Sequence, residues 1–228
     1  MPASLDPSLD EDNRSAWDTL YASTADLIWG SKPVAFLPRY LPVARSLPPG
    51  DVLDAAGGEG RNLSLLLRLD RPVTLCDSSP AALAKIPPGL ARRATIVECG
   101  LAAIPLPTAR FAFILVSDAV ETLPTPGPAL AELRRLLVPG GLLLANVPDR
   151  DDGIAGQDME PLDGAGWLYR HRYFYRFYSR AEAEAMLIGA GLEIVSSGDC
   201  CWCEPAHPHF RNSAHLHRSR IFLARRPG

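Results

Sequence analysis

Two acidic residues and a cluster of glycines have the spacing of a nucleotide-binding site. Asp54 lies in a short apolar run, and Gly57, Gly58 and Gly60 follow it. Asp77 ends the next apolar run, 17 positions after Gly60. Glycines let a ligand approach the backbone closely, and a carboxylate at the tip of the second strand can accept both ribose hydroxyl groups. Because charged acceptors form strong hydrogen bonds, we expect Asp77 to bind ribose, with a helix cap as the alternative.

The elements that must position these residues are a strand, a glycine turn and a helix. Residues 52–56 form an apolar run typical of a buried parallel strand, and the leucines of residues 63–69 predict the helix. A dinucleotide-binding turn has the pattern G-x-G-x-x-G, but Leu63 stands at its third glycine, which disfavours a dehydrogenase. Burying the carboxylate of Asp54 in an apolar strand costs free energy unless a positive group lies beside it, and a cationic ligand would supply that group.

In its residue pattern, this stretch resembles the first motif of the class I S-adenosylmethionine-dependent methyltransferases, which reads acidic-x-Gly-x-Gly-x-Gly. Asp54, Gly58 and Gly60 match the motif, whereas Ala56 replaces its first glycine. The later motifs follow in order up to about residue 147, and the resemblance becomes specific only when they are taken together. It implies an enzyme of the small-molecule type whose cofactor is S-adenosyl-L-methionine.

The resemblance also implies where the cofactor binds. Gly100 stands where the family has an aspartate for the adenine amino group, so that contact is missing or is replaced by the backbone N–H of Leu101. Asp118 follows a predicted strand and is our candidate for the boundary between cofactor and acceptor, with a helix start as the alternative. The expected cofactor-binding residues are Asp54, Ala56, Gly58, Gly60, Asn62, Asp77, Ser78, Gly100, Leu101 and Asp118.

The remaining pattern predicts an α/β fold. Four more parallel strands are expected at residues 71–76, 95–98, 111–116 and 142–147. Two last strands, residues 192–196 and 220–224, have no helix between them and should pair antiparallel. The predicted fold class is therefore a doubly wound, seven-stranded, mostly parallel sheet with an antiparallel last strand, the Rossmann-like fold of these methyltransferases. Residues 51–228 would form this domain, with insertions at 148–178 and 197–219.

Residues 1–50 are expected to form an N-terminal helical cap. Trp17, Leu20 and Tyr21 have the i, i+3, i+4 spacing of one helix face. The prolines of residues 33–49 predict an irregular chain between this helix and the first strand.

The first insertion contains a run that alternates aromatic and basic side chains, residues 167–178. Such a run could bind RNA by stacking, but residues 149–152 beside it are mostly acidic. We therefore expect a pocket wall or lid in which Arg172 and Tyr173 contact the acceptor. Trp29 lies in a segment similar to one that covers the cofactor in tellurite- and thiol-modifying methyltransferases, and it would either close this pocket or pack in a turn.

The second insertion gathers cysteines and histidines, namely Cys200, Cys201, Cys203, His207, His209, His215 and His217. Thiolate and imidazole bind zinc, but histidine pairs separated by one residue fit a tetrahedral site poorly, so we expect no metal. A histidine-bearing substrate loop is the main interpretation, and a solvated loop without function is an alternative. If the acceptor must lose a proton, His171, His207 or His209 would be its general base. A thiolate or metalloid oxyanion would need no base, so oxygen, sulfur and metalloid acceptors all stay open.

Composition limits the remaining possibilities. The 228 residues carry a formal charge of −3, without the basic excess typical of nucleic-acid binding. No stretch reaches the roughly 20 apolar residues that span a bilayer, and the N-terminus lacks the pattern of a secretion signal. Five cysteines, an odd number, argue against a disulfide framework. We therefore expect a cytoplasmic monomer or homodimer with a small-molecule substrate. An NAD-dependent oxidoreductase and a non-catalytic S-adenosylmethionine-binding protein are the alternative functions.

Overall fold

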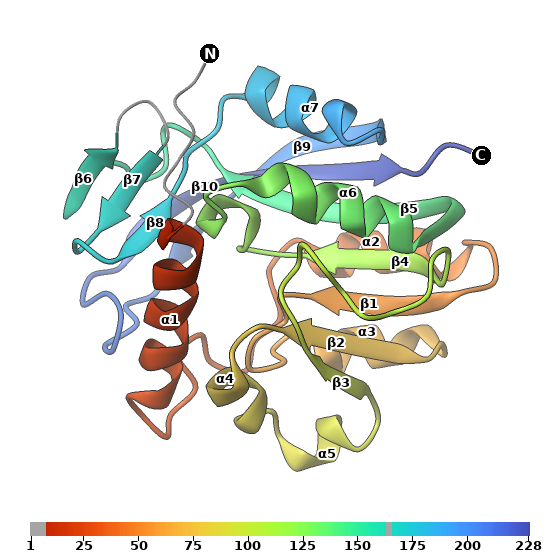
Figure 1. Ribbon diagram of the computed structural model, residues 1–228, viewed down its shortest axis with the longest axis horizontal. Coiled ribbons are helices and arrows are strands. Elements are labelled where there is room, and N and C mark those ends of the chain that lie inside the picture. The colour runs from red at the N-terminus through yellow and green to blue at the C-terminus, as the bar shows by residue number, and fades with distance from the viewer. Residues whose placement is uncertain (1–7, 163–165) are drawn as a thin grey trace.

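A sheet of seven strands lies at the centre of the computed structural model, which describes residues 8–162 and 166–228 (Figure 1). Its strand order is β3-β2-β1-β4-β5-β10-β9. Neighbours among β1 to β5 pair in parallel, whereas β10 runs antiparallel to both β5 and β9. This arrangement confirms the predicted fold class. The strands are β1 (Asp51–Ala55), β2 (Val73–Asp77), β3 (Thr95–Glu98), β4 (Phe111–Val116), β5 (Leu137–Pro148), β9 (Glu193–Glu204) and β10 (His215–Arg225).

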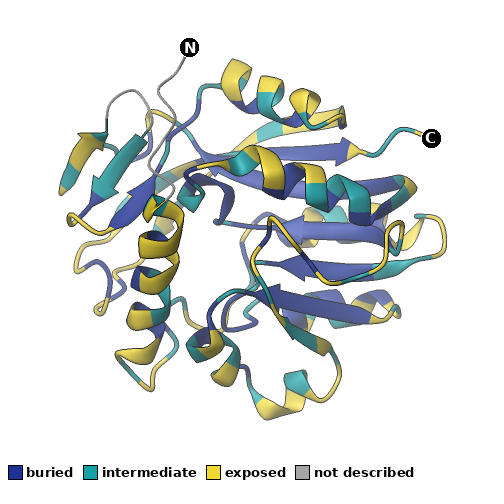
Figure 2. Ribbon diagram, viewed as in Figure 1, coloured by how far each residue is buried: buried dark blue, intermediate teal, exposed yellow. Residues whose placement is uncertain are grey.

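Helices cover both faces of this sheet. Leu53 and Ile114 pack against one group of helices, and Val52 and Phe113 against the other. Because alternate strand residues face opposite sides, both of which are covered, β2 and β4 are buried at every position, and β4 is also apolar at every position (Figure 2). None of the described helices is long and apolar enough to cross a bilayer. The helices are α1 (Ser8–Ala22), α2 (Leu37–Arg45), α3 (Leu63–Leu66), η1 (Leu67–Leu69), α4 (Pro80–Ala84), α5 (Pro88–Ala91), η2 (Val120–Thr122), α6 (Pro126–Leu136) and α7 (Arg180–Gly189).

The helix α2 corrects the prediction of an irregular chain over residues 33–49. Pro38 lies in its first turn, where a proline removes no hydrogen bond, but Pro42 lies inside the helix. Leu37, Leu41 and Ala44 share one face and are buried against the sheet. The burial of these side chains offsets the free energy that Pro42 costs the helix. The positions of helix-breaking residues alone do not predict this burial.

The first insertion forms a second, antiparallel sheet of three strands, β6 (Met159–Leu162), β7 (Gly166–Tyr169) and β8 (Tyr173–Tyr175). In Figure 1 this sheet and α1 stand on the side toward which β1, β2 and β4 point. Asn13 of α1 joins these parts, since its Nδ2 donates to the carbonyl of Thr122 at 2.7 Å and its Oδ1 accepts from the N–H of Phe174 at 2.9 Å. The small sheet and α1 therefore extend the carboxyl edge of the main sheet.

The second insertion is mostly strand rather than loop, which corrects its predicted bounds. β9 continues to Glu204 and β10 begins at His215, so only residues 205–214 connect them. His217 pairs with Trp202 in this hairpin, and His215 pairs with Glu204. The five cysteines are unpaired. Residues of β10 two positions apart therefore face the same side of the hairpin.

Candidate functional site

The glycine turn after β1 takes an unusual backbone path. Ala56, Gly58 and Gly60 have φ angles of 53°, 51° and 78°, in the left-handed region. This region costs an L-residue about 1–2 kcal/mol, so Ala56 adopts the conformation that the glycine of the family motif would adopt without strain. At Gly57 a Cβ atom would lie 2.6 Å from side-chain carbons of Leu75 in β2. Only glycine fits between the turn and this strand.

Asp77 at the end of β2 holds the turn in place. Its Oδ2 accepts the N–H of Gly58 at 2.8 Å, and its Oδ1 accepts the N–H of Ser79 at 2.9 Å. Burial raises the pKa of Asp77, and these backbone donors oppose the rise. Ser79 caps α4, because its hydroxyl accepts the N–H of Ala82 at 3.0 Å. The cap of this helix is therefore Ser79, and the carboxylate of Asp77 lines the pocket described next.

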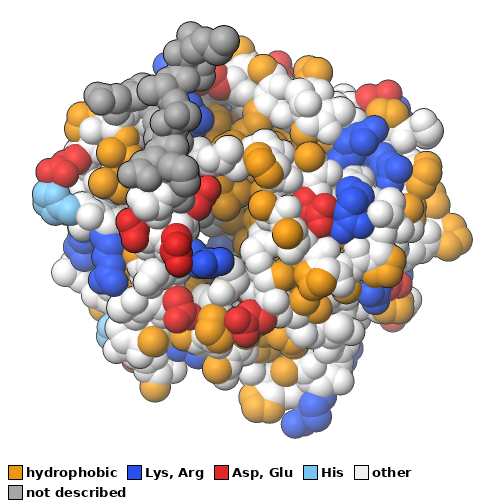
Figure 3. Space-filling view, viewed as in Figure 1, with side chains coloured by type: hydrophobic (Ala, Val, Ile, Leu, Met, Phe, Trp, Pro, Cys, Tyr) orange, Lys and Arg blue, Asp and Glu red, His pale blue; other side chains and the backbone are white. Residues whose placement is uncertain are grey.

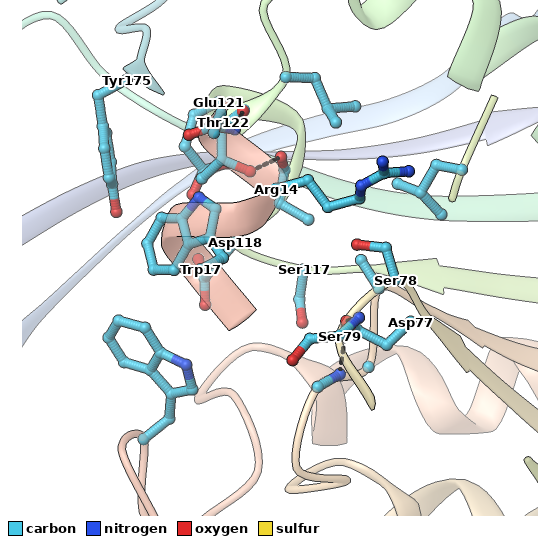
Figure 4. A pocket seen from close by; sticks show the side chains of 18 of the residues that line it. Arg14, Trp17, Asp77, Ser78, Ser79, Ser117, Asp118, Glu121, Thr122 and Tyr175 are labelled. Atoms are coloured by element: carbon cyan, nitrogen blue, oxygen red, sulfur yellow. Dashed lines mark hydrogen bonds between the residues drawn. The ribbon is translucent and has the colours of Figure 1, made fainter. Parts of the chain in front are cut away.

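A pocket of about 350 Å³ opens at the carboxyl ends of β1, β2 and β4. The surface is hollowed beside α1, with hydrophobic side chains inside and acidic ones at the rim (Figure 3). In Figure 4, Asp77, Ser78 and Ser79 lie on one side of the pocket and Trp17, Glu121 and Tyr175 on the other, with Asp118 between them. The expected cofactor residues that line it are Ala56, Gly58, Asn62, Asp77, Ser78, Gly100, Leu101 and Asp118.

Asp54 and Gly60 lie behind the pocket wall rather than in it. A Cβ at Gly60 would meet Leu63 at 3.0 Å and Ile86 at 3.3 Å, so this glycine permits packing and not the approach of a ligand. Asp54 is 1% exposed beneath the turn, and neither carboxylate oxygen has a hydrogen-bond partner. Burial raises its pKa to about 7, opposed by the nearby Arg61. Such a buried, unpartnered carboxyl is the kind of group that a nearby positive ligand would stabilise.

Asp118 is a fixed carboxylate near the middle of the pocket. Arg61 donates to its Oδ2, and Asn146 Nδ2 donates to its Oδ1 at 2.6 Å. The backbone N–H of Asp118 donates in return to Asn146 Oδ1 at 3.0 Å. Asp118 has a φ of 50° and lies in the bend between β4 and η2, so it does not start a helix.

Trp29 and His207 form one wall of the pocket. The Trp29 indole N–H donates to the hydroxyl of Tyr21 at 2.9 Å, and its ring lies 5.0 Å from that of His207. His207 Nδ1 lies 2.8 Å from the carbonyl of Ile28, and its Nε2 lies 2.6 Å from Glu204. Both ring nitrogens of His207 are therefore occupied by contacts with oxygen atoms of the protein, and neither is directed at free space in the pocket.

Four residues expected at the acceptor lie outside the pocket. His171 and Arg172 are exposed in the turn between β7 and β8, where His171 pairs with Glu160 at 2.8 Å. Tyr173 is buried in an aromatic cluster, 4.9 Å from the ring of Trp17, and His209 is exposed in the connection after β9. Of the aromatic-basic run, Tyr175 lines the pocket, whereas the side chains of His171 and Arg172 in the turn face solvent. These placements correct the expectation that all four line the pocket.

Sequence reasoning missed several residues of the far end of the pocket. His215 and His217 both line it, because an H-x-H spacing on a strand directs both rings to one face. That spacing is the available signal, but it directs both rings to one face only on a strand, and the sequence predicts a loop there. The other pocket residues not predicted include Trp17, Glu121, Tyr175, Trp202 and Arg211.

Asp152, His215 and His217 lie close enough together to hold a metal ion, with potential ligand atoms within 4.8 Å of one another. Arg211 argues against that use, because its Nη1 lies 3.1 Å from both ring nitrogens of His215. The oxygens of Asp152 also accept backbone N–H groups from Ile154 and Arg218 at 2.9 and 2.7 Å. We interpret the cluster as a hydrogen-bonded charge network, and the absence of zinc stays a prediction.

The comparisons with known proteins agree with this geometry. A family model described as a methyltransferase domain matches residues 29–197. A probable S-adenosylmethionine-dependent methyltransferase from Mycolicibacterium smegmatis is 31% identical over 146 residues, which are 63% of this chain and 52% of the relative. The chain thus spans about half the length of that curated relative.

Solved structures share the fold at low identity. The 1,6-didemethyltoxoflavin-N1-methyltransferase of Burkholderia thailandensis, with its substrate and S-adenosylhomocysteine bound, has a TM-score of 0.70 at 20% identity and covers 100% of this chain and 93% of its own. A possible histamine N-methyltransferase from Thermotoga maritima has a TM-score of 0.57 at 18% identity, and the match covers 93% of this chain and 94% of the other. The cyclase SpnF has a TM-score of 0.61 at 16% identity, and the match covers 100% of this chain and 98% of SpnF. The fold therefore occurs with more than one chemistry.

Proposed function

This chain belongs to the S-adenosylmethionine-dependent methyltransferases, and from that membership we propose that it transfers a methyl group from this cofactor to a small-molecule acceptor. The observation that carries the proposal is the pairing of Asp77 with the glycine turn across one pocket. The two N–H groups fix both carboxylate oxygens at the tip of β2, where ribose hydroxyls would donate to the remaining lone pairs.

The residues present fit the cofactor in charge and shape. Asp54 is an orphaned buried carboxyl beneath the turn, and the pocket continues from Asp77 past Ser78 to Gly100 and Leu101. When bound, S-adenosylmethionine would supply an electrophilic methyl group on a positively charged sulfur. We assign the ribose to Asp77 and the adenine to the side of Gly100 and Leu101.

Asp118 would then mark the boundary between cofactor and acceptor. Beyond it the pocket is lined by aromatic side chains, among them Trp17, Tyr175 and Trp202, which suit a flat organic molecule. Methyl transfer to an acceptor is an in-line displacement that depends mainly on positioning, and these aromatic side chains can position a flat acceptor. Oxygen, sulfur and metalloid acceptors remain part of the proposal, and the N-methyltransferase and the possible N-methyltransferase of the same fold add nitrogen to it.

The alternatives have less support. An NAD-dependent oxidoreductase would need a glycine where the fully buried Leu63 packs in the core. A non-catalytic cofactor-binding protein would bind the cofactor equally well, and only a turnover measurement separates it from an enzyme. The ionisable side chains at the acceptor end of the pocket favour the enzyme.

Thermal unfolding with S-adenosylhomocysteine, S-adenosylmethionine and NAD tests the proposal first. A ligand at 100 times its Kd stabilises the folded state by about 2.7 kcal/mol, which is readily measured. We expect a rise in Tm with both adenosyl compounds, and its loss in Asp77→Ala. A rise with NAD alone would refute the proposal. Release of S-adenosylhomocysteine in the presence of an acceptor panel of phenols, thiols, ring N–H compounds and metalloid oxyanions then tests catalysis.

A further inference from the structure

Asp152 and His217 form a pair of side chains at the acceptor end of the pocket. His217 Nδ1 lies 2.6 Å from Asp152 Oδ2, and the side chain of Asp152 is 0% exposed. The N–H groups of Ile154 and Arg218 fix the two oxygens of Asp152. Asp152 therefore cannot turn away, and it holds the imidazole of His217 in one orientation.

The second nitrogen of His217 faces the pocket. Its Nε2 lies 4.0 Å from Asp118 Oδ1, at the boundary assigned to cofactor and acceptor. The ring packs edge-on against Trp202, with centroids 4.4 Å apart. In the neutral ring, Nδ1–H donates to Asp152, so the lone pair is on Nε2 and is directed into the pocket.

We propose that His217, oriented by Asp152, is the general base that takes a proton from the methyl acceptor. This inference rests on the proposed function and adds a class of substrate to it, namely acceptors with an O–H or N–H group. As the acceptor's O–H or N–H bond breaks, the proton goes to Nε2 and the bonding pair forms the new bond to the methyl carbon. The pair of the broken carbon–sulfur bond stays on sulfur, and the imidazolium later returns its proton to water.

The other two histidines of the pocket are less suited to this role. Both ring nitrogens of His207 already contact protein oxygen atoms, as described above. For His215, burial and then the neighbouring Arg211 hold the pKa at about 4, so it is too weak a base at neutral pH. His217 alone combines an anchored Nδ1 with a free Nε2 among the pocket histidines of the described chain.

The charges around His217 support proton uptake. Burial lowers the pKa of His217, but the hydrogen bond to Asp152 and the charges of Asp118 and Glu204 outweigh it, so the net shift is upward. His215 on the same strand has a pKa of about 4, so it is uncharged near neutral pH, and Arg61 partly neutralises Asp118. An imidazolium formed during methyl transfer would therefore be stabilised by its surroundings.

Nitrogen NMR of histidine-labelled protein tests the pair without any acceptor. In the neutral form we expect His217 to be the Nδ1–H tautomer with a pKa above the ordinary value of about 6.5, and we expect Asp152→Asn to lower that pKa. His171, exposed in a distant turn, is the internal reference. An Nε2–H tautomer, or a pKa unchanged by Asp152→Asn, would overturn the assignment.

Turnover provides the second measurement, with phenols and ring N–H compounds as probes. His217→Gln should lower kcat by at least about 100-fold and remove the rise of rate with pH, with S-adenosylhomocysteine affinity unchanged. Leu216→Gln, on the other face of β10 and exposed, is the control. If only tertiary amines or metalloid oxyanions are methylated, the base is unnecessary and this inference fails while the proposed function stands. Failure of S-adenosylhomocysteine to bind refutes the proposed function itself, and zinc bound at His217 also overturns the base.

Discussion

The two ends of the pocket are held together by different kinds of contact. At the cofactor end, a carboxylate binds backbone N–H groups of Gly58 and Ser79, and the turn has left-handed φ angles. At the acceptor end, side chains bind side chains across long stretches of sequence, as in the pairs of Arg61 with Asp118 and of His217 with Asp152. The first end depends on the backbone path, and the second depends on the identity of individual side chains.

This difference indicates how each end responds to change. A substitution that moves the backbone of the turn should disturb both stability and cofactor binding. A substitution in a side-chain pair should alter acceptor chemistry and leave the fold largely intact. His217, for example, projects from β10, and this strand is held by its own ladder hydrogen bonds to β5 and β9. The following predictions test this contrast.

Gly57→Val should have the largest effect. The new Cβ would lie 2.6 Å from Leu75, which is fully buried, and 3.0 Å from the carboxyl carbon of Asp54. We expect a loss of more than about 3 kcal/mol in the free energy of unfolding and no cofactor binding. Urea unfolding measures the loss, with Gly100→Ala as the control, since a Cβ there meets nothing within 4 Å. Equal stability of both variants would contradict a turn packed tightly on β2.

Asp77→Ala should weaken binding of S-adenosylhomocysteine by about 1.5–3 kcal/mol, because a charged acceptor of ribose hydroxyls is lost. Its two backbone N–H partners also lose their acceptor, so the Tm without ligand should fall as well. Calorimetric titration checks the affinity, and Asp118→Asn is the comparison from the boundary of the two ends. An affinity that Asp77→Ala leaves unchanged would remove the ribose assignment.

The elements that the sequence predicted are those whose signals are local. The apolar run of β4 and the glycine turn each lie within a few residues, and each formed as expected. The pairing of Asp152 with His217 joins residues 65 positions apart, so no local pattern reports it. The exposed position of His171 depends on which side of a hairpin faces solvent, which tertiary packing decides.

Asp54→Asn tests the charge beneath the turn through pH. Burial raises the folded-state pKa of Asp54 to about 7, so the folded state retains a proton that the unfolded state has lost. This stabilisation is fully present below about pH 4 and is lost as pH rises through 7, by up to about 1.4 kcal/mol per unit. Urea unfolding at pH 5 to 8 should show this slope in the native sequence and a flatter one in Asp54→Asn. Parallel slopes would mean that Asp54 is ionised throughout.

Glu204→Gln tests the acceptor end in the same way, with the opposite sign. Burial raises the pKa of Glu204, but hydrogen bonds from His207 and Trp202 outweigh it and hold the pKa at about 2. The contribution of Glu204 is therefore present above its ordinary pKa and is lost as pH falls toward 2. We expect a smaller effect than at Asp54, seen only in acid, and no change in S-adenosylhomocysteine affinity. A weaker affinity in Glu204→Gln would show that the two ends are not separable.

Ala56→Gly should have the smallest effect and the opposite direction, toward greater stability. Ala56 has a φ of 53°, which costs an alanine about 1–2 kcal/mol and a glycine almost nothing. Glycine loses about 0.5–1 kcal/mol through its greater freedom in the unfolded chain, so the net gain should be about 0.5–1 kcal/mol. Because Ala56 lines the pocket and its methyl group is removed, cofactor affinity should stay the same or rise slightly. Urea unfolding beside a titration with S-adenosylhomocysteine measures both quantities.

Ala109, another alanine with a φ of 53° but far from the pocket, provides the matched variant Ala109→Gly, which should gain similar stability without any change in binding. A loss of stability in Ala56→Gly with a gain in Ala109→Gly would show that the alanine methyl group contributes packing at the cofactor end, and that this end is not governed by the backbone path alone.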